Sequence, residues 1–217
     1  MTFYFGDVVP YLPLMLRALW VSVYVTLGSF ILGSGLGVFV YLGRDSGSRL
    51  LRTLAASFIE IFRNTPLLVQ LYLIYFGLPQ FGVNLNPLWS TLLGMTLNNA
   101  AYTSEIFRAG IQSVPAGMRE AASALGMRFG QTFRYVVLKP AIRNVLPALT
   151  NQFIVLFLFS SVGSVISLNE LTATLEDLNQ RTLLTLEVFS VGALLYYVTS
   201  AAIAWSSRLA EKTLFRW

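Results

Sequence analysis

The chain contains no cysteine and no histidine, and only two of its 217 residues are lysines. These absences exclude disulfide bonds, thiol catalysis, haem attachment through cysteine and the usual zinc sites. Neither Lys139 nor Lys212 follows a glycine, so the sequence also lacks a phosphate-binding loop of the GxxxxGK[ST] type. The chemistry that such groups carry must therefore belong to another chain or be absent.

Charged residues are scarce as well. They make up 12% of the chain, whereas 55% of the residues are hydrophobic and the mean hydropathy is +0.65. This composition is typical of a polytopic membrane protein. The net charge of +5 does not indicate nucleic-acid binding, because the basic residues flank apolar stretches and form no patch with interleaved aromatic residues. We therefore expect no nucleic-acid partner.

Five apolar stretches are long enough to cross about 30 Å of hydrocarbon as helices of about 20 residues each. They cover residues 18–42, 53–78, 88–109, 145–168 and 183–205. The N-terminus has no basic leader, so we expect the first stretch to remain as an anchor. No repeat and no linker divides the chain. The sequence thus predicts an all-α transmembrane bundle of five helices in a single domain of residues 1–217.

The distribution of charge predicts the orientation of this bundle. If the five helices alternate across the membrane, most basic residues fall on one side, which the positive-inside rule assigns to the cytoplasm. The N-terminus is then outside and the C-terminus inside. The twelve basic residues on the inner side are Arg44, Arg49, Arg52, Arg108, Arg119, Arg128, Arg134, Lys139, Arg143, Arg208, Lys212 and Arg216. The acidic residues expected on the outer side are Asp7, Glu170, Glu176, Asp177 and Glu187.

A polar, arginine-rich loop of about residues 112–144 separates the first three apolar stretches from the last two. Within it, Pro115 can begin a short helix and Gly126 can supply the left-handed residue that ends one. Taken alone, these residues are better explained as a solvated amphipathic connector. Its central sequence is Arg119, Glu120, Ala121, Ala122, Ser123, Ala124, Leu125 and Gly126.

The second apolar stretch is interrupted by Asn64, Thr65 and Pro66. Because proline has no N–H, the carbonyl of Phe62 loses its helical hydrogen bond inside the membrane. Such an interruption is tolerated only where protein or a water-filled cavity satisfies the exposed backbone. This stretch is therefore expected to face the interior of the bundle.

The third stretch carries Asn98 and Asn99 about half-way across the membrane, counting about 1.5 Å per residue. Amides there must meet protein, water or substrate, so they either link helices or line a pathway. Two carboxylates in these stretches have an arginine three residues later. We expect structural ion pairs between Glu60 and Arg63 and between Glu105 and Arg108.

Small residues form a stripe in the first stretch. Ser29, Gly33 and Gly37 recur at four-residue spacing. Because packing replaces the hydrophobic effect as the drive for helix association in lipid, this stripe predicts a close approach by another helix.

The central loop resembles a known family. Glu120-Ala121-Ala122, then three residues and Gly126, then nine residues and residues 136–138, is similar to the EAA loop of bacterial ABC importer permeases. One departure is that Lys139 separates this segment from Pro140, whereas the family usually has the proline directly after the leucine. Residues 63–70, 75–79 and 101–111 are similar to the polar amino-acid branch of the same permeases.

The resemblance implies a type I ABC importer fold and a multi-pass permease subunit in the bacterial inner membrane. It implies transport of polar amino acids or related small zwitterions by alternating access, without covalent chemistry or a cofactor in this chain. The implied partners are a dimer of ATPase subunits that uses ATP and Mg²⁺, a second permease subunit, and a periplasmic or tethered binding protein.

The resemblance also assigns roles to residues. The coupling residues toward the ATPase would be Arg119, Glu120, Ala121, Ala122, Ala124, Leu125 and Gly126. The neutral polar residues expected along the substrate pathway are Asn64, Thr65, Asn98, Asn99, Tyr102, Ser160 and Ser161.

Relatives in this branch often carry a Lys-Asp-Thr-Ser cluster, whereas this chain has Leu158, Phe159, Ser160 and Ser161 there. Without the charged pair at 158–159, the substrate preference of those relatives does not carry over. The transported amino acid stays open, as does the choice between an identical and a non-identical second permease.

Two other classes of membrane protein are alternatives. An ion- or proton-coupled secondary carrier could use Glu60, Glu105 or Glu187, but the sequence has no inverted repeat and two of these carboxylates have arginine neighbours. A membrane-embedded enzyme would need histidine, cysteine or paired carboxylates, which this chain lacks.

Overall fold

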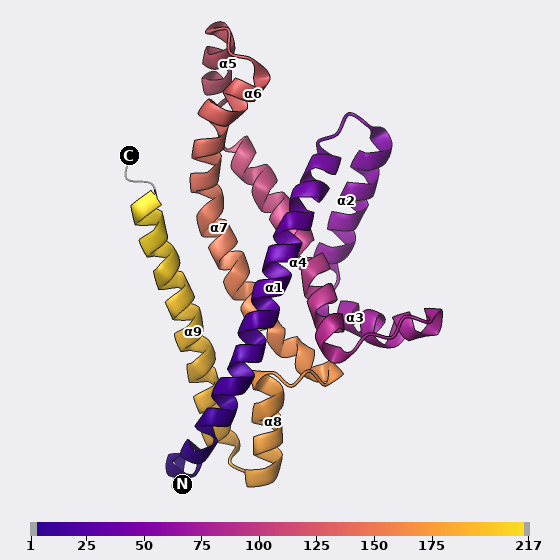
Figure 1. The fold of residues 1–217 in the computed structure, drawn as a ribbon, viewed down its shortest axis with the longest axis vertical. Coiled ribbons are helices and arrows are strands. Elements are labelled where there is room, and N and C mark those ends of the chain that lie inside the picture. The colour runs from indigo at the N-terminus through magenta and orange to yellow at the C-terminus, as the bar shows by residue number, and fades with distance from the viewer. Residues whose placement is uncertain (1–3, 215–217) are drawn as a thin grey trace.

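The computed structural model describes residues 4–214, and the expectation for Arg216 falls outside them. Within that range the chain is all helical, as predicted, with no strand (Figure 1). The α-helices are α1 Leu12–Arg44, α2 Arg49–Asn64, α3 Leu67–Tyr72, α4 Pro87–Gln112, α5 Ala116–Ala124, α6 Phe129–Gln131, α7 Leu138–Phe159, α8 Leu171–Thr182 and α9 Thr185–Leu214. The 3₁₀ and π turns are η1 Phe5–Asp7, η2 Val9–Tyr11, η3 Leu73–Gly77, η4 Leu78–Phe81, η5 Thr132–Val137 and η6 Ser160–Ile166.

The long helices run along the long axis of the molecule. Figure 1 shows the N-terminal end of α1 and the short helix α8 at one end, with α5 and α6 at the opposite end. Helix α4 packs along α1 and also contacts α7, and α7 in turn contacts α9. The described part of the chain therefore places its central loop and its N-terminus at opposite ends.

Three segments among the described residues are long and apolar enough to cross a membrane, namely Phe5–Arg44, Phe129–Ile166 and Thr185–Thr213. Helix α4 is less apolar because polar side chains run along its buried face. These buried polar residues are Ser90, Thr91, Thr96, Asn98, Asn99, Thr103 and Ser104. Length and composition thus support three of the five expected membrane spans. The total of five spans stays a prediction.

The second expected span, residues 53–78, is not one helix. Helix α2 ends at Asn64, Thr65 and Pro66 are extended, and α3 begins at Leu67. Proline disfavours a helical conformation in the residue before it and removes a hydrogen-bond donor, which explains the break at this point. Figure 1 shows the segment after the break turning away from the axis of α2.

The fourth expected span also has different bounds. Helix α7 begins at Leu138 and ends at Phe159, so residues 138–144 of the expected loop are helical. The π-helical turn η5 lies directly before it. Pro140 in the first turn of α7 has no N–H to donate to the carbonyl of Val136 in this π turn.

The predicted stripe of small residues is confirmed as the contact between α1 and α4. A Cβ atom on Gly33 would lie 2.8 Å from the carbonyl oxygen of Thr96, and one on Gly37 would lie 3.0 Å from that of Ala100. The hydroxyl of Ser29 donates to the carbonyl of Leu92 at 3.3 Å. The backbones of α1 and α4 therefore approach closely here, and no side chain larger than hydrogen fits at positions 33 and 37.

This contact gives a matched pair of substitutions. We expect Gly33→Ala to lower the free energy of unfolding by about 1–3 kcal/mol, because the added methyl overpacks a backbone contact. Gly35→Ala serves as the control, since its Cβ would meet no described atom within 4 Å and alanine favours the helix. Thermal unfolding of the purified protein in detergent measures both. Equal midpoints for the two variants would contradict the close contact.

Candidate functional site

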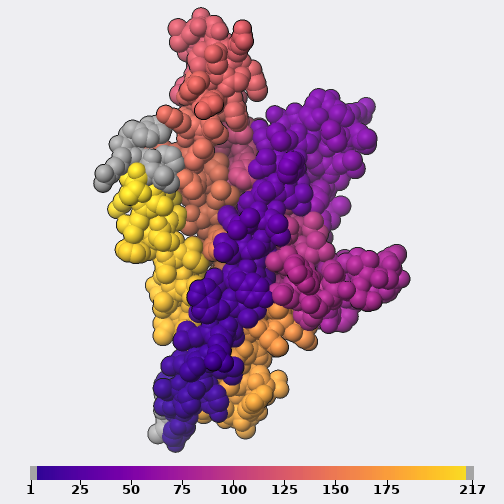
Figure 2. Space-filling view, in the orientation of Figure 1, coloured from indigo at the N-terminus to yellow at the C-terminus, as the bar shows by residue number. Residues whose placement is uncertain are grey.

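Helix α5 forms the tip of the molecule at the end that lies away from the N-terminus (Figures 1 and 2). Pro115 directly precedes its first residue, and Gly126 has φ +75° just beyond its end. Proline suits the entrance of a helix and glycine readily adopts the left-handed conformation at its exit. The helix predicted between these two residues is confirmed.

The residues of this segment divide by exposure. Arg119 donates from its guanidinium to the carbonyl of Ile111, and Ala122 is buried. The others face outward, with Leu125 82% exposed. The exposed set consists of Glu120, Ala121, Ser123, Ala124, Leu125 and Gly126. Arg119 and Ala122 thus hold α5 against the rest of the chain, while the remaining residues present a surface.

The break between α2 and α3 is closed by two side-chain amides. The Nε2 atom of Gln70 donates to the carbonyl of Phe62 at 3.0 Å, and the Nδ2 atom of Asn98 donates to the same oxygen at 3.2 Å. The Asn98 amide also donates to Oε1 of Gln70 at 3.1 Å. The carbonyl freed by Pro66 is therefore satisfied by protein, as expected. Sequence reasoning missed Gln70, whose signal was a single amide in an apolar run.

Asn99 links three helices. Its Nδ2 donates to the carbonyl of Phe30 in α1 at 3.3 Å, and its Oδ1 accepts from Nε2 of Gln152 in α7 at 3.2 Å. Asn98, Asn99 and Ser160 are all buried, and Ser160 donates locally to the carbonyl of Phe157. In this conformation the two asparagines therefore join helices, which was one of the two interpretations left open.

The other expected pathway residues lie at surfaces. Asn64 and Thr65 are exposed at the break after α2. Tyr102 lines an open cavity of about 460 Å³ between α4 and α7, and Ser161 lines another of about 610 Å³ beside α9. The structure thus does not bring the seven predicted pathway residues together in one site.

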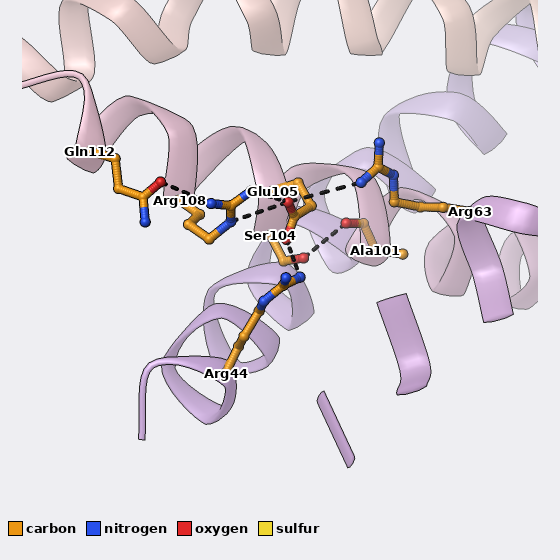
Figure 3. A network of polar contacts seen from close by, with 7 residues as sticks. All are labelled: Arg44, Arg63, Ala101, Ser104, Glu105, Arg108 and Gln112. Carbon is orange, nitrogen blue, oxygen red and sulfur yellow. Dashed lines mark hydrogen bonds and ion pairs between the residues drawn. The ribbon is translucent and has the colours of Figure 1, made fainter. Parts of the chain in front are cut away.

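Glu105 is the centre of a charged cluster (Figure 3). It accepts hydrogen bonds from the guanidinium of Arg44 in α1 and from that of Arg108, whose Nη2 lies 2.6 Å from Oε2. The Nη1 atom of Arg63 in α2 lies 3.9 Å from the same oxygen. The expected pair of Glu105 and Arg108 is confirmed.

The expected pair of Glu60 and Arg63 is wrong. Glu60 forms no ion pair with any described residue, and Arg63 turns to Glu105 instead. The side chain of Glu105 is only 15% exposed, whereas Glu60 is exposed to the surroundings. A partly buried carboxylate attracts a guanidinium more strongly than an exposed one, because less solvent screens the charges.

A second buried carboxylate lies at the opposite end of the molecule. Glu170 is 0% exposed, although the sequence placed it among the acidic residues of an outer surface. Its Oε1 accepts the backbone N–H of Ala173 at 2.9 Å and caps α8. Its Oε2 accepts from the hydroxyls of Ser22 in α1 at 3.1 Å and Tyr196 in α9 at 2.9 Å. One carboxylate therefore joins three helices.

Burial raises the pKa of Glu170 above its ordinary value, and the hydrogen bonds that it accepts oppose this shift. Glu187 is also buried and accepts the backbone N–H of Tyr4 at 3.1 Å. The sequence placed Glu187 among the acidic residues of the outer side and did not indicate the burial of Glu170. Its position directly before a helical segment, where a side chain can cap, was the available signal.

Removal of the Glu170 side chain should destabilise the fold. We expect Glu170→Ala to lower the free energy of unfolding by about 1–3 kcal/mol, because the cap and two buried hydroxyls lose their acceptor. Glu176→Ala is the control, since this residue is exposed on the same helix and should change stability by less than about 0.5 kcal/mol. Thermal unfolding in detergent compares the two variants, and similar midpoints would contradict the structural role of Glu170.

The raised pKa of Glu170 gives a pH dependence with a defined sign. The folded state holds this proton more tightly than the unfolded state, whose pKa is about 4.3. The resulting stabilisation is complete below that value and is lost as pH rises through the higher folded pKa. We expect the free energy of unfolding of wild type, relative to that of Glu170→Gln, to fall as pH rises from the unfolded-state pKa of Glu170 through its folded-state pKa. A difference that stays constant or rises with pH would contradict the shift.

Comparison with known proteins agrees with this architecture. The family described as "Binding-protein-dependent transport system inner membrane component" matches residues 33–216. The arginine transport system permease protein ArtQ of Bacillus subtilis is 33% identical, over 97% of this chain and 96% of its own. The nopaline transport system permease protein NocM of Agrobacterium fabrum is 37% identical over 92% and 87%, and the glutamine transport system permease protein GlnP of Escherichia coli is 31% identical over 99% of both chains.

Solved structures show the same fold. A chain of an amino acid ABC transporter crystallised with histidines superposes with a TM-score of 0.93 at 38% identity, covering 98% of this chain and all of that one. A chain of the MetNI methionine ABC transporter in an inward-facing conformation has a TM-score of 0.74 at 21% identity, covering 94% of this chain and 97% of its own. The fold is thus of the type I ABC importer kind, and the chain belongs to the family of inner membrane components of binding-protein-dependent transport systems.

Proposed function

We propose that this chain is the permease subunit of an ATP-driven importer for polar amino acids or related small zwitterions. The observation that carries the proposal is the match over nearly the whole chain to a membrane subunit of an amino acid ABC transporter. Curated relatives named for arginine, nopaline and glutamine transport support the same substrate class. These substrates all carry a carboxylate and an amino group, so the class is better supported than any one member.

The proposed setting is the bacterial inner membrane, with five spans, the N-terminus outside and the C-terminus inside. Helices α1, α7 and α9 have the length and composition for this role. Helix α4 would be the third span with its polar face turned inward, and α2 with α3 would form the interrupted second span. The basic residues then gather at the end that carries α5, as the positive-inside rule requires. All of residues 1–217 would form one permease domain.

The exposed surface of α5 is proposed to dock on the ATPase dimer. That surface includes Glu120 and Leu125, while Arg119 ties α5 to the carbonyl of Ile111 in α4, and α5 also contacts the η5 turn that lies directly before α7. A movement of the ATPases would therefore pass into both long helices. ATP and Mg²⁺ would be bound by the ATPase, and this chain would contribute the difference in stability between inward- and outward-facing states.

A second permease subunit would complete the pathway, and a binding protein would deliver substrate at the end that carries α8. Asn64, Thr65, Tyr102 and Ser161 are accessible enough to meet substrate, whereas Asn98, Asn99 and Ser160 hold helices together in this conformation. Leu158 and Phe159 are partly exposed where relatives carry charges. An apolar surface there is compatible with a non-identical partner that supplies the missing polar groups.

A secondary carrier is the weaker alternative. Such a carrier needs a carboxylate that is free to bind an ion or proton. Glu105 already accepts hydrogen bonds from two arginines and lies near a third. Glu187 accepts a backbone N–H, and Glu60, which forms no ion pair with a described residue, is exposed. The family match favours an ATP-driven system.

Uptake into proteoliposomes that contain the permease, its ATPase and its binding protein tests the proposal. We expect Glu120→Arg and Leu125→Asp to lose ATPase co-purification and to lower ATP-driven uptake of L-arginine or L-glutamine at least tenfold, since both side chains are exposed on α5. Gly130→Ala is the control in the same loop, because its Cβ would meet no described atom within 4 Å. Uptake that needs no ATPase and follows a proton or sodium gradient would overturn the importer assignment.

A further inference from the structure

The guanidinium of Arg63 is held in place but keeps its hydrogen-bond donors free. It lies 5.3 Å from the centroid of the Tyr102 ring and 3.9 Å from Oε2 of Glu105. Arg44 and Arg108, in contrast, both donate hydrogen bonds to Glu105. No described residue accepts a hydrogen bond from the side chain of Arg63, which is 42% exposed. An arginine guanidinium has five N–H donors in a planar fork. In Arg63 this fork is oriented by its neighbours, and its donors are available to a ligand.

Charged residues of both signs surround this arginine. Three guanidiniums surround the single carboxylate of Glu105 (Figure 3). Glu60 lines a neighbouring hollow of about 240 Å³ together with Arg44 and Arg63, and it is the other acidic group there. Asp45 lines a further hollow with Arg44 and Arg108, so the arginines and carboxylates of the wider cluster balance. At the wall of the cavity of about 460 Å³, however, Arg63 and Arg108 exceed Glu105 by one charge, and this wall therefore attracts an anion.

The donors of Arg63 border a cavity of suitable size and chemistry. This cavity of about 460 Å³ lies between the ends of α4 and α7, within the range typical of small-molecule sites. Its wall also contains oxygen atoms that can accept hydrogen bonds from an ammonium group, in Glu105 and in Asn144. Asn144 donates through Nδ2 to the hydroxyl of Ser113 at 2.8 Å, so its amide oxygen is directed by that bond. The cavity thus offers donors for a carboxylate beside acceptors for an ammonium.

We propose that Arg63 binds the α-carboxylate of the transported amino acid at the cytoplasmic end of the pathway. This inference rests on the proposed function. Arginine pairs with carboxylates through two parallel N–H donors, which a lysine cannot reproduce. Stacking on Tyr102 and attraction to Glu105 orient the fork before the ligand arrives. Because Arg63 is exposed to solvent, its pair with the substrate is screened and can dissociate as the substrate leaves.

Equilibrium binding to the purified permease–ATPase complex without binding protein tests the assignment. The probes are L-arginine with its decarboxylated analogue agmatine, and L-glutamine with its decarboxylated analogue 4-aminobutanamide. We expect Arg63→Gln to weaken binding of the transported amino acid about tenfold or more, and Arg63→Lys to weaken it to an intermediate degree. Binding of the decarboxylated analogue should be the same in all variants. Arg143→Gln is the control, since this exposed arginine lies outside the cavity.

Several results would overturn the proposal. Unchanged affinity in Arg63→Gln, or wild-type affinity in Arg63→Lys, would show that the fork makes no contact with the carboxylate. An equal loss for the amino acid and its decarboxylated analogue would reduce Arg63 to a structural role. Arg63→Lys keeps the charge beside Glu105, so it remains informative if Arg63→Gln fails to assemble.

The N–H donors of Arg63 could also bind the phosphate of an anionic lipid headgroup. Uptake into vesicles with and without an anionic lipid distinguishes this lipid contact from a contact with the substrate carboxylate. A substrate contact predicts the same defect of Arg63→Gln in phosphatidylcholine vesicles and in vesicles that also contain phosphatidylglycerol. A defect confined to vesicles with phosphatidylglycerol would assign the fork to lipid and overturn the substrate contact. Wild type without ATP-driven uptake would refute the proposed function itself, whereas normal uptake by both forms would refute only the role of Arg63.

Discussion

The backbone contact between α1 and α4 is the constraint on which the rest of the bundle depends. Gly33 and Gly37 allow the two helices to touch along one face. That approach brings the carbonyl of Phe30 within reach of Asn99, and it brings Arg44 to Glu105. A wider spacing would leave a buried amide and a partly buried carboxylate without these partners, which in lipid is more costly than in water. The close packing of α1 on α4 is therefore also what gives Asn99 and Glu105 these partners.

The interruption after α2 shows how a broken helix persists inside such a bundle. Pro66 frees a carbonyl, and the amides of Gln70 and Asn98 both bind it. One amide comes from α3, which follows the break, and the other from α4, which contacts both α2 and α3, so the break is fixed to its neighbours. The residues at the break, Asn64 and Thr65, stay at the surface. The helix is thus interrupted without leaving that backbone group unpaired.

The two ends of the molecule are held differently. At one end, α5 rests on the buried Ala122 and a hydrogen bond from Arg119, and most of its surface is exposed. At the other end, α8 is tied by the carboxylate of Glu170 to both α1 and α9. An element with few buried contacts moves at lower free-energy cost than one fixed by a buried network. This difference suits a helix α5 that moves with a partner protein and an end around α8 that keeps its conformation.

The sequence by itself determined those features that depend on residues close to one another along the chain. Pro115 and Gly126 bound α5, the glycine stripe marks a helix contact, and Glu105 pairs with the arginine one turn later. Only the tertiary structure decided that Arg63 turns to Glu105 and that Glu170 is buried. Arg63 lies 42 residues from Glu105, and Glu170 lies 148 residues from Ser22 and 26 from Tyr196. Spacing along one helix carries no information on which helices become neighbours.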